Sequence, residues 1–416
     1  MNNLVIICAI LLLVLLFLKV PVYIAVLSAS AVYFIGTPGM NLSIFAQKTI
    51  SGAEGLSLLA IPFFVCAGIF MNYTGVTKRI MNCCEVLTAR MPGGLAQVNI
   101  LLSTLMGGLS GSSLADAAMQ CKMLVPTMES KGYSKSFSTV ITAASGMVVP
   151  LIPPGVGLII YGCINNISIG KLFIAGIGPG IVLCVTLMIF THFLSKKRGY
   201  LPSRTTKIPV SEKIAAVRPA FLPLLLPIII IGGVRIGVFT ASEAGTVAIV
   251  YAVLLGLLYK ELTLKNVMQG CKETVTTTAS IMLIVAAATC FSWILTKEQI
   301  PQQFSQWMIS NIHNKYVFLI MVNIFLLIVG MFIEGNASMI VLAPLLHPVA
   351  MAYGIDDIHF AMVYIFNCTI GAFTPPMGTL MFVSCGITKC PTKDFIKEAV
   401  PFYILFAIDI IVLTYI

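Results

Sequence analysis

Two short segments of the chain combine small polar residues with a carboxylate, a set of groups that suits a desolvated cation. Residues 107–116 hold three serines and three glycines and end at Asp116. Residues 330–336 hold Glu334 and Asn336. If non-helical backbone lies at membrane depth, it must line a protein cavity, because lipid satisfies neither N–H nor C=O groups. Such a bend offers carbonyls, hydroxyls and a carboxylate to a cation, and helix N-termini to an anion.

Each of these two acids stands alone in an apolar stretch, Asp116 between residues 93 and 126 and Glu334 between residues 301 and 344. An acid at the bilayer centre costs about 2.5–3.5 kcal/mol, so it usually has a function or a partner. One interpretation is sodium coordination or proton carriage. The other is a carboxylate that caps the following helix by accepting its N–H groups. Both can hold at once.

Double prolines follow both segments, at Pro153-Pro154 and Pro375-Pro376. Proline inside a helix removes a hydrogen bond and clashes with a carbonyl one turn back, so each pair predicts an unwound stretch with free carbonyls. An ungapped comparison that places Pro126 on Pro344 sets Asp116 opposite Glu334 and Ser112 opposite Gly330. Paired breaks at matching places are typical of inverted-repeat transporters. The alternative for each break is a simple kink or an interhelical loop.

The amino-acid composition indicates that these segments belong to a membrane protein. The 416 residues are 58% hydrophobic and only 10% charged, with a mean hydropathy of +1.01. A water-soluble surface needs about 25% charged residues, so the composition excludes a soluble enzyme, a disordered protein and a nucleic-acid binder. We therefore expect an all-α polytopic protein forming a single integral membrane unit over 1–416. Its long apolar runs are 3–18, 21–36, 57–71, 172–194, 220–238, 244–259, 276–295 and 400–416.

A basic connection divides the chain nearly in half. Residues 195–218 carry seven Lys and Arg residues against the single acid Glu212, a bias typical of cytoplasmic loops; binding of lipid headgroups is a weaker alternative. This division predicts a first repeat over about 20–194 and a second over 219–416. We expect hairpin tips near 107–116 and 330–336, and broken helices near 150–157 and 371–379.

The segment Gly108-Leu-Ser-Gly111 also matches a pattern of intramembrane serine proteases, with Ser110 as the nucleophile. That chemistry needs a histidine base within reach of the serine. Four histidines occur in the chain, and none lies in the expected packing context. An intramembrane hydrolase is therefore a remote alternative, and we expect no enzyme activity and no cofactor. The histidines are His192, His313, His347 and His359.

Several motifs together resemble the large membrane subunit of tripartite ATP-independent periplasmic (TRAP) transporters, from about residue 3 to the C-terminus. They are residues 60–68 (AIPFFVCAG), 92–96 (PGGLA), 110–116 (SGSSLAD), 150–154 (PLIPP), 237–244 (GVFTASEA), 298–301 (EQIP) and 374–376 (TPP). The resemblance implies an elevator transporter with a scaffold part, a mobile part and two re-entrant hairpins. It implies sodium-driven import of an organic acid, such as a C4-dicarboxylate or sialic acid, across the bacterial cytoplasmic membrane.

By this resemblance the chain acts with a small four-helix membrane subunit and a periplasmic substrate-binding protein. Sodium ions as coupling ions would bind at Ser110, Gly111, Ser112, Asp116 and Pro150, and at Gly330, Glu334, Asn336, Gly371, Thr374 and Pro375. The substrate would lie against Ser112, Ser113, Pro154, Gly155, Gly157, Glu334 and Thr379.

Two features depart from the family pattern. Glu334 stands where an aspartate is usual, and Gly155 and Gly157 replace bulkier residues after the double proline. These departures weaken any transfer of substrate identity. A stand-alone ion-coupled anion carrier without a soluble receptor is the main alternative. A passive channel is disfavoured, because two matched broken helices suit occlusion better than a continuous pore.

Overall fold

The computed structural model describes residues 3–18, 20–204 and 206–416, and within these ranges its regular secondary structure is entirely helical. Six helices in the described part of the chain are long and apolar enough to cross a membrane. A seventh span is counted if Ala60–Tyr73 and Val76–Thr88, which meet at 70°, form one bent crossing. The prediction of an all-α polytopic membrane protein is therefore confirmed.

The first half of the chain ends in the longest helix of that half. Pro179 lies inside this helix, yet the helix continues without a break to the basic connection. The helices are α1 (Asn3–Phe17), α2 (Val22–Gly36), α3 (Leu42–Ser51), η1 (Leu56–Leu59), α4 (Ala60–Tyr73), α5 (Val76–Thr88), α6 (Gly94–Ser110), α7 (Ser113–Ser130), α8 (Lys135–Gly146), α9 (Val156–Asn165) and α10 (Ile169–Lys197).

The second half begins with α11–α14, and its last five helices, α15–α19, follow in the same order as α6–α10, with a two-residue tip and then a double-proline break. Its helices are α11 (Val210–Arg235), α12 (Ala241–Leu258), α13 (Leu264–Lys297), α14 (Ile300–Asn311), α15 (Lys315–Phe332), α16 (Gly335–Ala352), α17 (Asp357–Phe373), α18 (Thr379–Thr388) and α19 (Thr392–Tyr415).

The helical arms of the two hairpins are longer, and the tips between them shorter, than the sequence predicts. The apolar runs 94–106 and 117–128 predict two short helical pieces around a ten-residue bend. Instead α6 and α7 extend to residues 110 and 113, so only Gly111 and Ser112 separate them. In the second hairpin only Ile333 and Glu334 separate α15 from α16. Close packing favours glycine in the last turn of α6, because a Cβ on Gly108 would lie 2.6 Å from the Pro227 Cγ.

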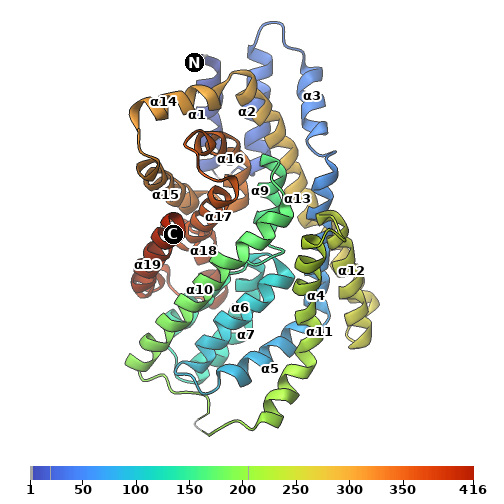
Figure 1. Ribbon diagram of the computed structural model, residues 1–416, viewed down its shortest axis with the longest axis vertical. Helices are drawn as coiled ribbons and strands as arrows, with labels where there is room; N and C mark the ends of the chain where they lie inside the picture. The colour runs from blue at the N-terminus through green and yellow to red at the C-terminus, as the bar shows by residue number, and fades with distance from the viewer. Residues whose placement is uncertain (1–2, 19, 205) are drawn as a thin grey trace.

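The halves interlock through their broken helices. The segment that follows the first double proline, α9, packs on α16 of the second hairpin. Correspondingly α18, which follows the second double proline, packs on α7 of the first hairpin. A separate set of helices, α2, α3 and α4, packs along α13. Figure 1 shows α6 and α7 in the lower half of the molecule and α15 and α16 in the upper half.

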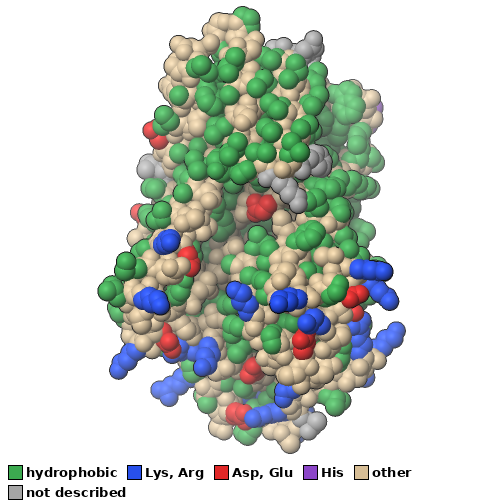
Figure 2. Space-filling view, turned by 180° about the vertical axis from the view of Figure 1, so that it is seen from behind, with side chains coloured by type: hydrophobic (Ala, Val, Ile, Leu, Met, Phe, Trp, Pro, Cys, Tyr) green, Lys and Arg blue, Asp and Glu red, His purple; other side chains and the backbone are tan. Residues whose placement is uncertain are grey.

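Charge is distributed unevenly along the long axis. The connection between α10 and α11 lies at the lower end of the molecule (Figure 1). Figure 2 shows Lys and Arg side chains gathered in the lower half of one face, an upper half that is mostly apolar, and a hollow between them. The basic connection folds back on the α5–α6 turn, where the Arg204 N–H donates to the Ala89 carbonyl at 2.9 Å.

Candidate functional site: a cavity between the two hairpin tips

The first tip turns at a glycine that no other residue could replace without strain. Gly111 adopts a left-handed φ of +62°, and a Cβ there would lie 2.8 Å from the Pro154 carbonyl oxygen. The Gly111 carbonyl accepts a hydrogen bond from the Val156 N–H at 3.3 Å. Ser112 follows in an extended conformation and caps α7, its hydroxyl accepting from the Ala115 N–H at 3.4 Å. The first tip is thereby fixed to the start of α9.

The second tip is capped by a carboxylate instead of a hydroxyl. Glu334 is extended, and its Oε2 accepts from the Ala337 N–H at 3.1 Å. Its Oε1 accepts from the Asn336 side-chain amide at 2.8 Å. Of the two interpretations of Glu334, the helix cap is therefore confirmed, and Asn336 holds the carboxylate in place.

Both double prolines break a helix, as the sequence predicts. Residues 147–155 separate α8 from α9, and residues 374–378 separate α17 from α18. The Pro153-Pro154 and Pro375-Pro376 peptide bonds are both cis. Each double proline therefore lies in a non-helical segment between two helices.

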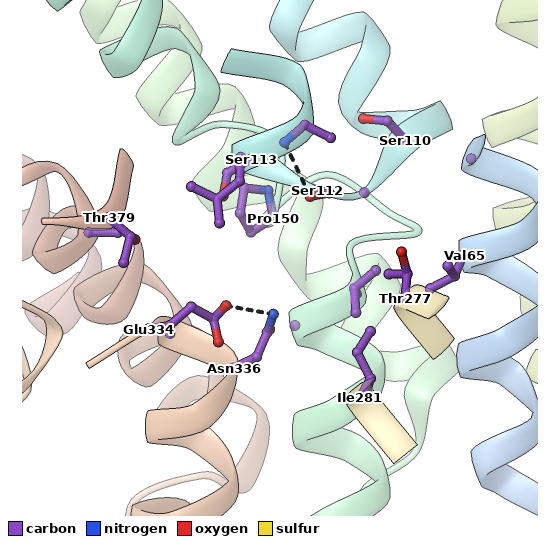
Figure 3. A pocket seen from close by; sticks show the side chains of 18 of the residues that line it. Val65, Ser110, Ser112, Ser113, Pro150, Thr277, Ile281, Glu334, Asn336 and Thr379 are labelled. Atoms are coloured by element: carbon purple, nitrogen blue, oxygen red, sulfur yellow. Dashed lines mark hydrogen bonds between the residues drawn. The ribbon is translucent and has the colours of Figure 1, made fainter. Parts of the chain in front are cut away.

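These elements enclose a cavity of about 490 Å³. The N-terminal residues of four helices line it: α7 through residues 113–115, α9 through 156–157, α16 through 335–336 and α18 through Thr379. Figure 3 shows Ser112, Ser113 and Pro150 on one side and Glu334 with Asn336 on the other. Because a helix N-terminus carries a partial positive charge and unpaired N–H groups, four of them at one cavity favour an anion.

The sequence prediction misses one wall of this cavity. It is built by α4 and α13, which contribute Val65, Gly68, Ile69, Asn72, Thr276, Thr277, Ser280 and Ile281. The approach is close, because a Cβ on Gly68 would lie 2.9 Å from the Ser110 carbonyl oxygen. A signal for α13 is present in the sequence, since hydroxyl residues 276–278 and 280 interrupt an otherwise apolar span.

Most of the predicted site residues meet at this cavity. Those that line it are Ser110, Gly111, Ser112, Ser113, Pro150, Gly157, Glu334, Asn336 and Thr379. Gly330, Gly371, Thr374, Pro375, Pro154 and Gly155 are not among its lining residues.

Asp116 also lies outside the lining of the cavity. Its side chain is 2% exposed, and its Oδ2 accepts from the Ser103 hydroxyl at 2.6 Å and from the Gln120 amide at 2.8 Å. Its Oδ1 is buried and has no hydrogen-bond partner in the part of the chain that the structure describes. Helix periodicity explains the position, since a residue one turn into α7 faces the α6–α7 interface behind the tip.

Gly330 and Gly371 touch each other behind the second tip. A Cβ on Gly371 would lie 2.6 Å from the Gly330 Cα, and a Cβ on Gly330 would lie 2.9 Å from the Gly371 Cα. The two glycines therefore permit α15 and α17 to pack backbone against backbone, a packing role that is visible only in three dimensions.

The helix bounds also correct the register between the hairpins. α7 begins at residue 113 and α16 at residue 335, and the double prolines begin at residues 153 and 375. The two helix starts are therefore separated by the same number of residues as the two double prolines. By that separation Ser112 corresponds to Glu334, and both residues cap the next helix. The pairing of Asp116 with Glu334 is therefore wrong, because Pro126 corresponds to Pro348, one helical turn beyond Pro344.

The serine at the first tip lacks the partner that a hydrolase needs. The Ser110 hydroxyl is buried without a hydrogen-bond partner among the described residues. Of the described residues that line the cavity, none is a histidine, and His347 instead lies 3.4 Å from the Tyr161 hydroxyl. The geometry supports binding at this cavity rather than nucleophilic chemistry.

The comparison with known families decides the identity. The model for "Tripartite ATP-independent periplasmic transporter, DctM component" matches residues 9–416. The chain belongs to the DctM family of TRAP transporters. As a DctM-family large permease it is a multi-pass protein of the bacterial inner membrane and a transport protein rather than an enzyme.

Named relatives cover almost the whole chain. The sialic acid TRAP transporter large permease protein SiaM of Vibrio cholerae is 40% identical over 95% of this chain and 93% of that protein. The C4-dicarboxylate TRAP transporter large permease protein DctM of Pseudomonas aeruginosa is 36% identical over 89% and 87%. The 2,3-diketo-L-gulonate TRAP transporter large permease protein YiaN of Escherichia coli is 36% identical over 92% and 90%.

Among solved structures, the YdaH transporter of Alcanivorax borkumensis has a similar fold. The TM-score is 0.65 over 94% of this chain and 96% of that one, at 13% identity. The MtrF protein of Neisseria gonorrhoeae matches with a TM-score of 0.55 at 12% identity, over 99% of this chain and 94% of that one. Both likenesses concern the fold alone.

Proposed function

We propose that this DctM-family permease imports an organic acid by sodium-coupled secondary active transport. It would receive the acid from a periplasmic binding protein and work beside a small four-helix membrane subunit. The observation that carries the proposal is the cavity of about 490 Å³ at which four helix N-termini meet a single acid, Glu334. The names of the relatives, which specify sialic acid, C4-dicarboxylates and a diketo sugar acid, support a carboxylate cargo.

The negative charge of Glu334 explains why an organic acid would need a cation bound beside it in the cavity. Glu334 is the only charged side chain among the described residues that line the cavity. A substrate carboxylate beside it would place two negative charges in a medium of low dielectric, where repulsion between like charges is strong. Sodium ions bound at the tips would offset this repulsion. Binding of sodium and of the acid would then each favour the other, which is the thermodynamic requirement for coupling.

Oxygen ligands for sodium are available at both tips. Ser110, Gly111, Ser112 and Pro150 offer hydroxyls and carbonyls at the first site, with Asp116 as a buried negative charge behind it. At the second site we propose Glu334 and Asn336 at the cavity, supported by the backbone around Gly330, Gly371, Thr374 and Pro375.

We propose further that the two hairpins are re-entrant, that the halves form inverted repeats, and that transport follows an elevator mechanism. The interlocked packing of α9 on α16 and of α18 on α7 would make the tips one mobile body. The wall of α4 and α13 would belong to the scaffold along which that body moves. The basic connection 195–218 would lie in the cytoplasm, by its charge.

The test is uptake of labelled organic acids into proteoliposomes that contain this chain and its small membrane subunit, with the binding protein added outside. An inward sodium gradient should drive uptake, and dissipating that gradient should abolish it. Uptake driven equally well by a proton gradient in sodium-free buffer would reject the sodium coupling. Full uptake without the binding protein would favour a stand-alone carrier.

A further inference from the structure

A basic groove lies between α5 and the first three turns of α11, at the end of the molecule that carries the connection 195–218 (Figure 1). This α5–α11 groove has a volume of about 360 Å³ and shares none of its described lining residues with the cavity between the hairpin tips. α5 contributes two cations, Lys78 and Arg79, and α11 contributes small residues such as Ala216. Glu261 is the only acid among the described lining residues. The groove therefore carries a net positive charge.

The two cations of the groove are not neutralised by the chain itself. Among the described residues, neither Lys78 nor Arg79 forms an ion pair with an acid. The Arg79 guanidinium lies over the Tyr259 ring, 3.7 Å from its centre, and its Nη1 donates to the Gly75 carbonyl at 2.9 Å. A guanidinium has five N–H donors, so further donors remain for a ligand. An ammonium and a guanidinium side by side suit a phosphate group.

The sequence of α11 places the groove at the level of the lipid headgroups. Residues 219–234 carry no charge and are bracketed by Arg218 and Arg235. At 1.5 Å per residue this run spans about 24 Å, close to the thickness of the hydrocarbon core, so the two arginines lie near its two boundaries. Pro219 lines the groove beside Arg218 and accepts a hydrogen bond from the Tyr259 hydroxyl at 3.1 Å. Tyrosine is enriched at this boundary.

An exposed apolar surface adjoins the groove on its membrane side. The second half of α12 exposes Leu254, Leu257 and Leu258, each by more than half of its surface. Tyr259 follows directly and contacts α11 at the groove. A free phosphate would use the cations alone. A phospholipid would use both the cations and this apolar surface, so the combination favours a lipid.

We propose that the α5–α11 groove binds the headgroup of an anionic phospholipid. The phosphate would lie against Lys78 and Arg79, and the acyl chains would run along the exposed leucines of α12. Basic pockets between helices at the cytoplasmic face are typical sites for anionic headgroups. In phosphatidylglycerol the hydroxyls of the headgroup would donate to Glu261, which gives the acid of the groove a partner. The proposal holds whatever the transported acid and the coupling ion are.

A lipid at this groove would act on the segment that leads to the first hairpin. α5 joins α4, which lines the cavity, to α6, the first arm of that hairpin. α4 and α5 meet at 70°, and the bond from Arg79 to the Gly75 carbonyl lies at this bend. A headgroup held by Lys78 and Arg79 would therefore keep α5 at the membrane surface and fix the position of the bend.

The test compares lipids that differ only in the headgroup. The readout is the thermal unfolding midpoint of this chain, purified with its small membrane subunit in an uncharged detergent. The additions are phosphatidylglycerol, phosphatidylcholine with the same acyl chains, and inorganic phosphate. A ligand that binds only the folded state raises the midpoint. We expect phosphatidylglycerol to raise it by about 2 °C or more, and the other two additions to raise it by less than half as much.

Three variants locate the site. Lys78→Glu reverses a charge in the groove and should halve the shift with phosphatidylglycerol or reduce it further. The matched control is Lys196→Glu, which makes the same change at an exposed lysine in the last turn of α10, outside the groove, and should keep the full shift. Ala216→Leu fills the groove without changing its charge and should also reduce the shift.

Four outcomes would overturn the proposal. An equal shift with phosphatidylcholine would show that the headgroup charge does not matter, and an equal shift with inorganic phosphate would assign the groove to a free anion. Equal losses in Lys78→Glu and Lys196→Glu would reduce the effect to the overall charge of this end of the molecule. No shift with phosphatidylglycerol would leave the groove to a protein partner. Each variant is compared with its own midpoint without lipid, so a loss of stability alone does not count as a loss of binding.

Discussion

The two hairpins have the same helical framework but place their polar groups differently. In the first, a neutral serine caps α7 and the acid, Asp116, lies behind the tip in a buried contact with Ser103 and Gln120. In the second, the acid itself, Glu334, caps α16 and lines the cavity. The comparison shows that the residue at the cap position decides whether a helix N-terminus is left open to a ligand or already neutralised.

The largest expected effect is on coupling at the second tip. Glu334→Gln keeps the shape of the cap but removes the only side-chain charge among the described lining residues of the cavity. We expect sodium activation of uptake to weaken about a hundredfold, equivalent to about 2.8 kcal/mol. The measurement is uptake as a function of sodium concentration. The same substitution at an exposed site, Glu54→Gln, is the control; equal behaviour of the two variants would show that Glu334 is only a cap.

The next effect concerns the close contact behind the second tip. Gly371→Ala would place a Cβ 2.6 Å from the Gly330 Cα, and two backbones cannot yield as a flexible side chain can. We expect a loss of about 2 kcal/mol in stability, with reduced uptake. Thermal unfolding measures it. Gly386→Ala, where no atom lies within 4 Å of the added Cβ, should be neutral; if both variants are equally stable, the helices are not in contact there.

Asp116 should behave differently from Glu334 under the same change. Asp116→Ala leaves the Ser103 hydroxyl without its buried acceptor, at a cost of about 1–2 kcal/mol in stability, while the Gln120 amide keeps the Ser103 hydroxyl as an acceptor at 2.6 Å. We expect its apparent sodium affinity to fall less than that of Glu334→Ala. Thermal unfolding and sodium titration of both alanine variants measure these effects. A larger loss of sodium affinity in Asp116→Ala than in Glu334→Ala would show that the carboxylate important for sodium binding is Asp116.

The smallest effect is expected at the first cap. Ser112→Ala removes the hydroxyl that accepts the Ala115 N–H, which costs about 1 kcal/mol at a helix N-terminus. Ser112→Asp should restore the cap but fill the N-terminus with a charge, as Glu334 does in the second hairpin. Acid uptake should therefore be mildly reduced in the first variant and severely in the second. Recovery of uptake in Ser112→Asp would contradict the assignment of this N-terminus to the substrate.

The sequence predicts the local elements of this site well, because their signals are local. Glycines, prolines and lone acids in an apolar chain mark the two tips and the two breaks. Glu334 and Asn336 are identified by these local signals, whereas Pro150 is identified through the family resemblance. The cap role of Glu334 was one of two interpretations, and only its contact with the Ala337 N–H selects it.

Two aspects of the site depend on packing that no local pattern encodes. Asp116 faces the interior of the first hairpin because α7 begins at Ser113, one turn before it. The ungapped comparison with the second hairpin implied a start of α7 four residues later, which would have put Asp116 at the tip. The wall of Thr277 and Asn72 comes from helices far apart in the sequence, and a run of hydroxyl residues in α13 is equally compatible with a lipid-facing or buried position.

The most direct measurement is the position of a bound organic acid, one whose uptake sodium drives, in an experimental structure of the assembled transporter determined in saturating sodium. We expect the carboxylate to lie inside the cavity, within hydrogen-bond distance of the N–H groups at the start of α7. A carboxylate bound against the Glu334–Asn336 tip, or an acid bound outside this cavity, would contradict it.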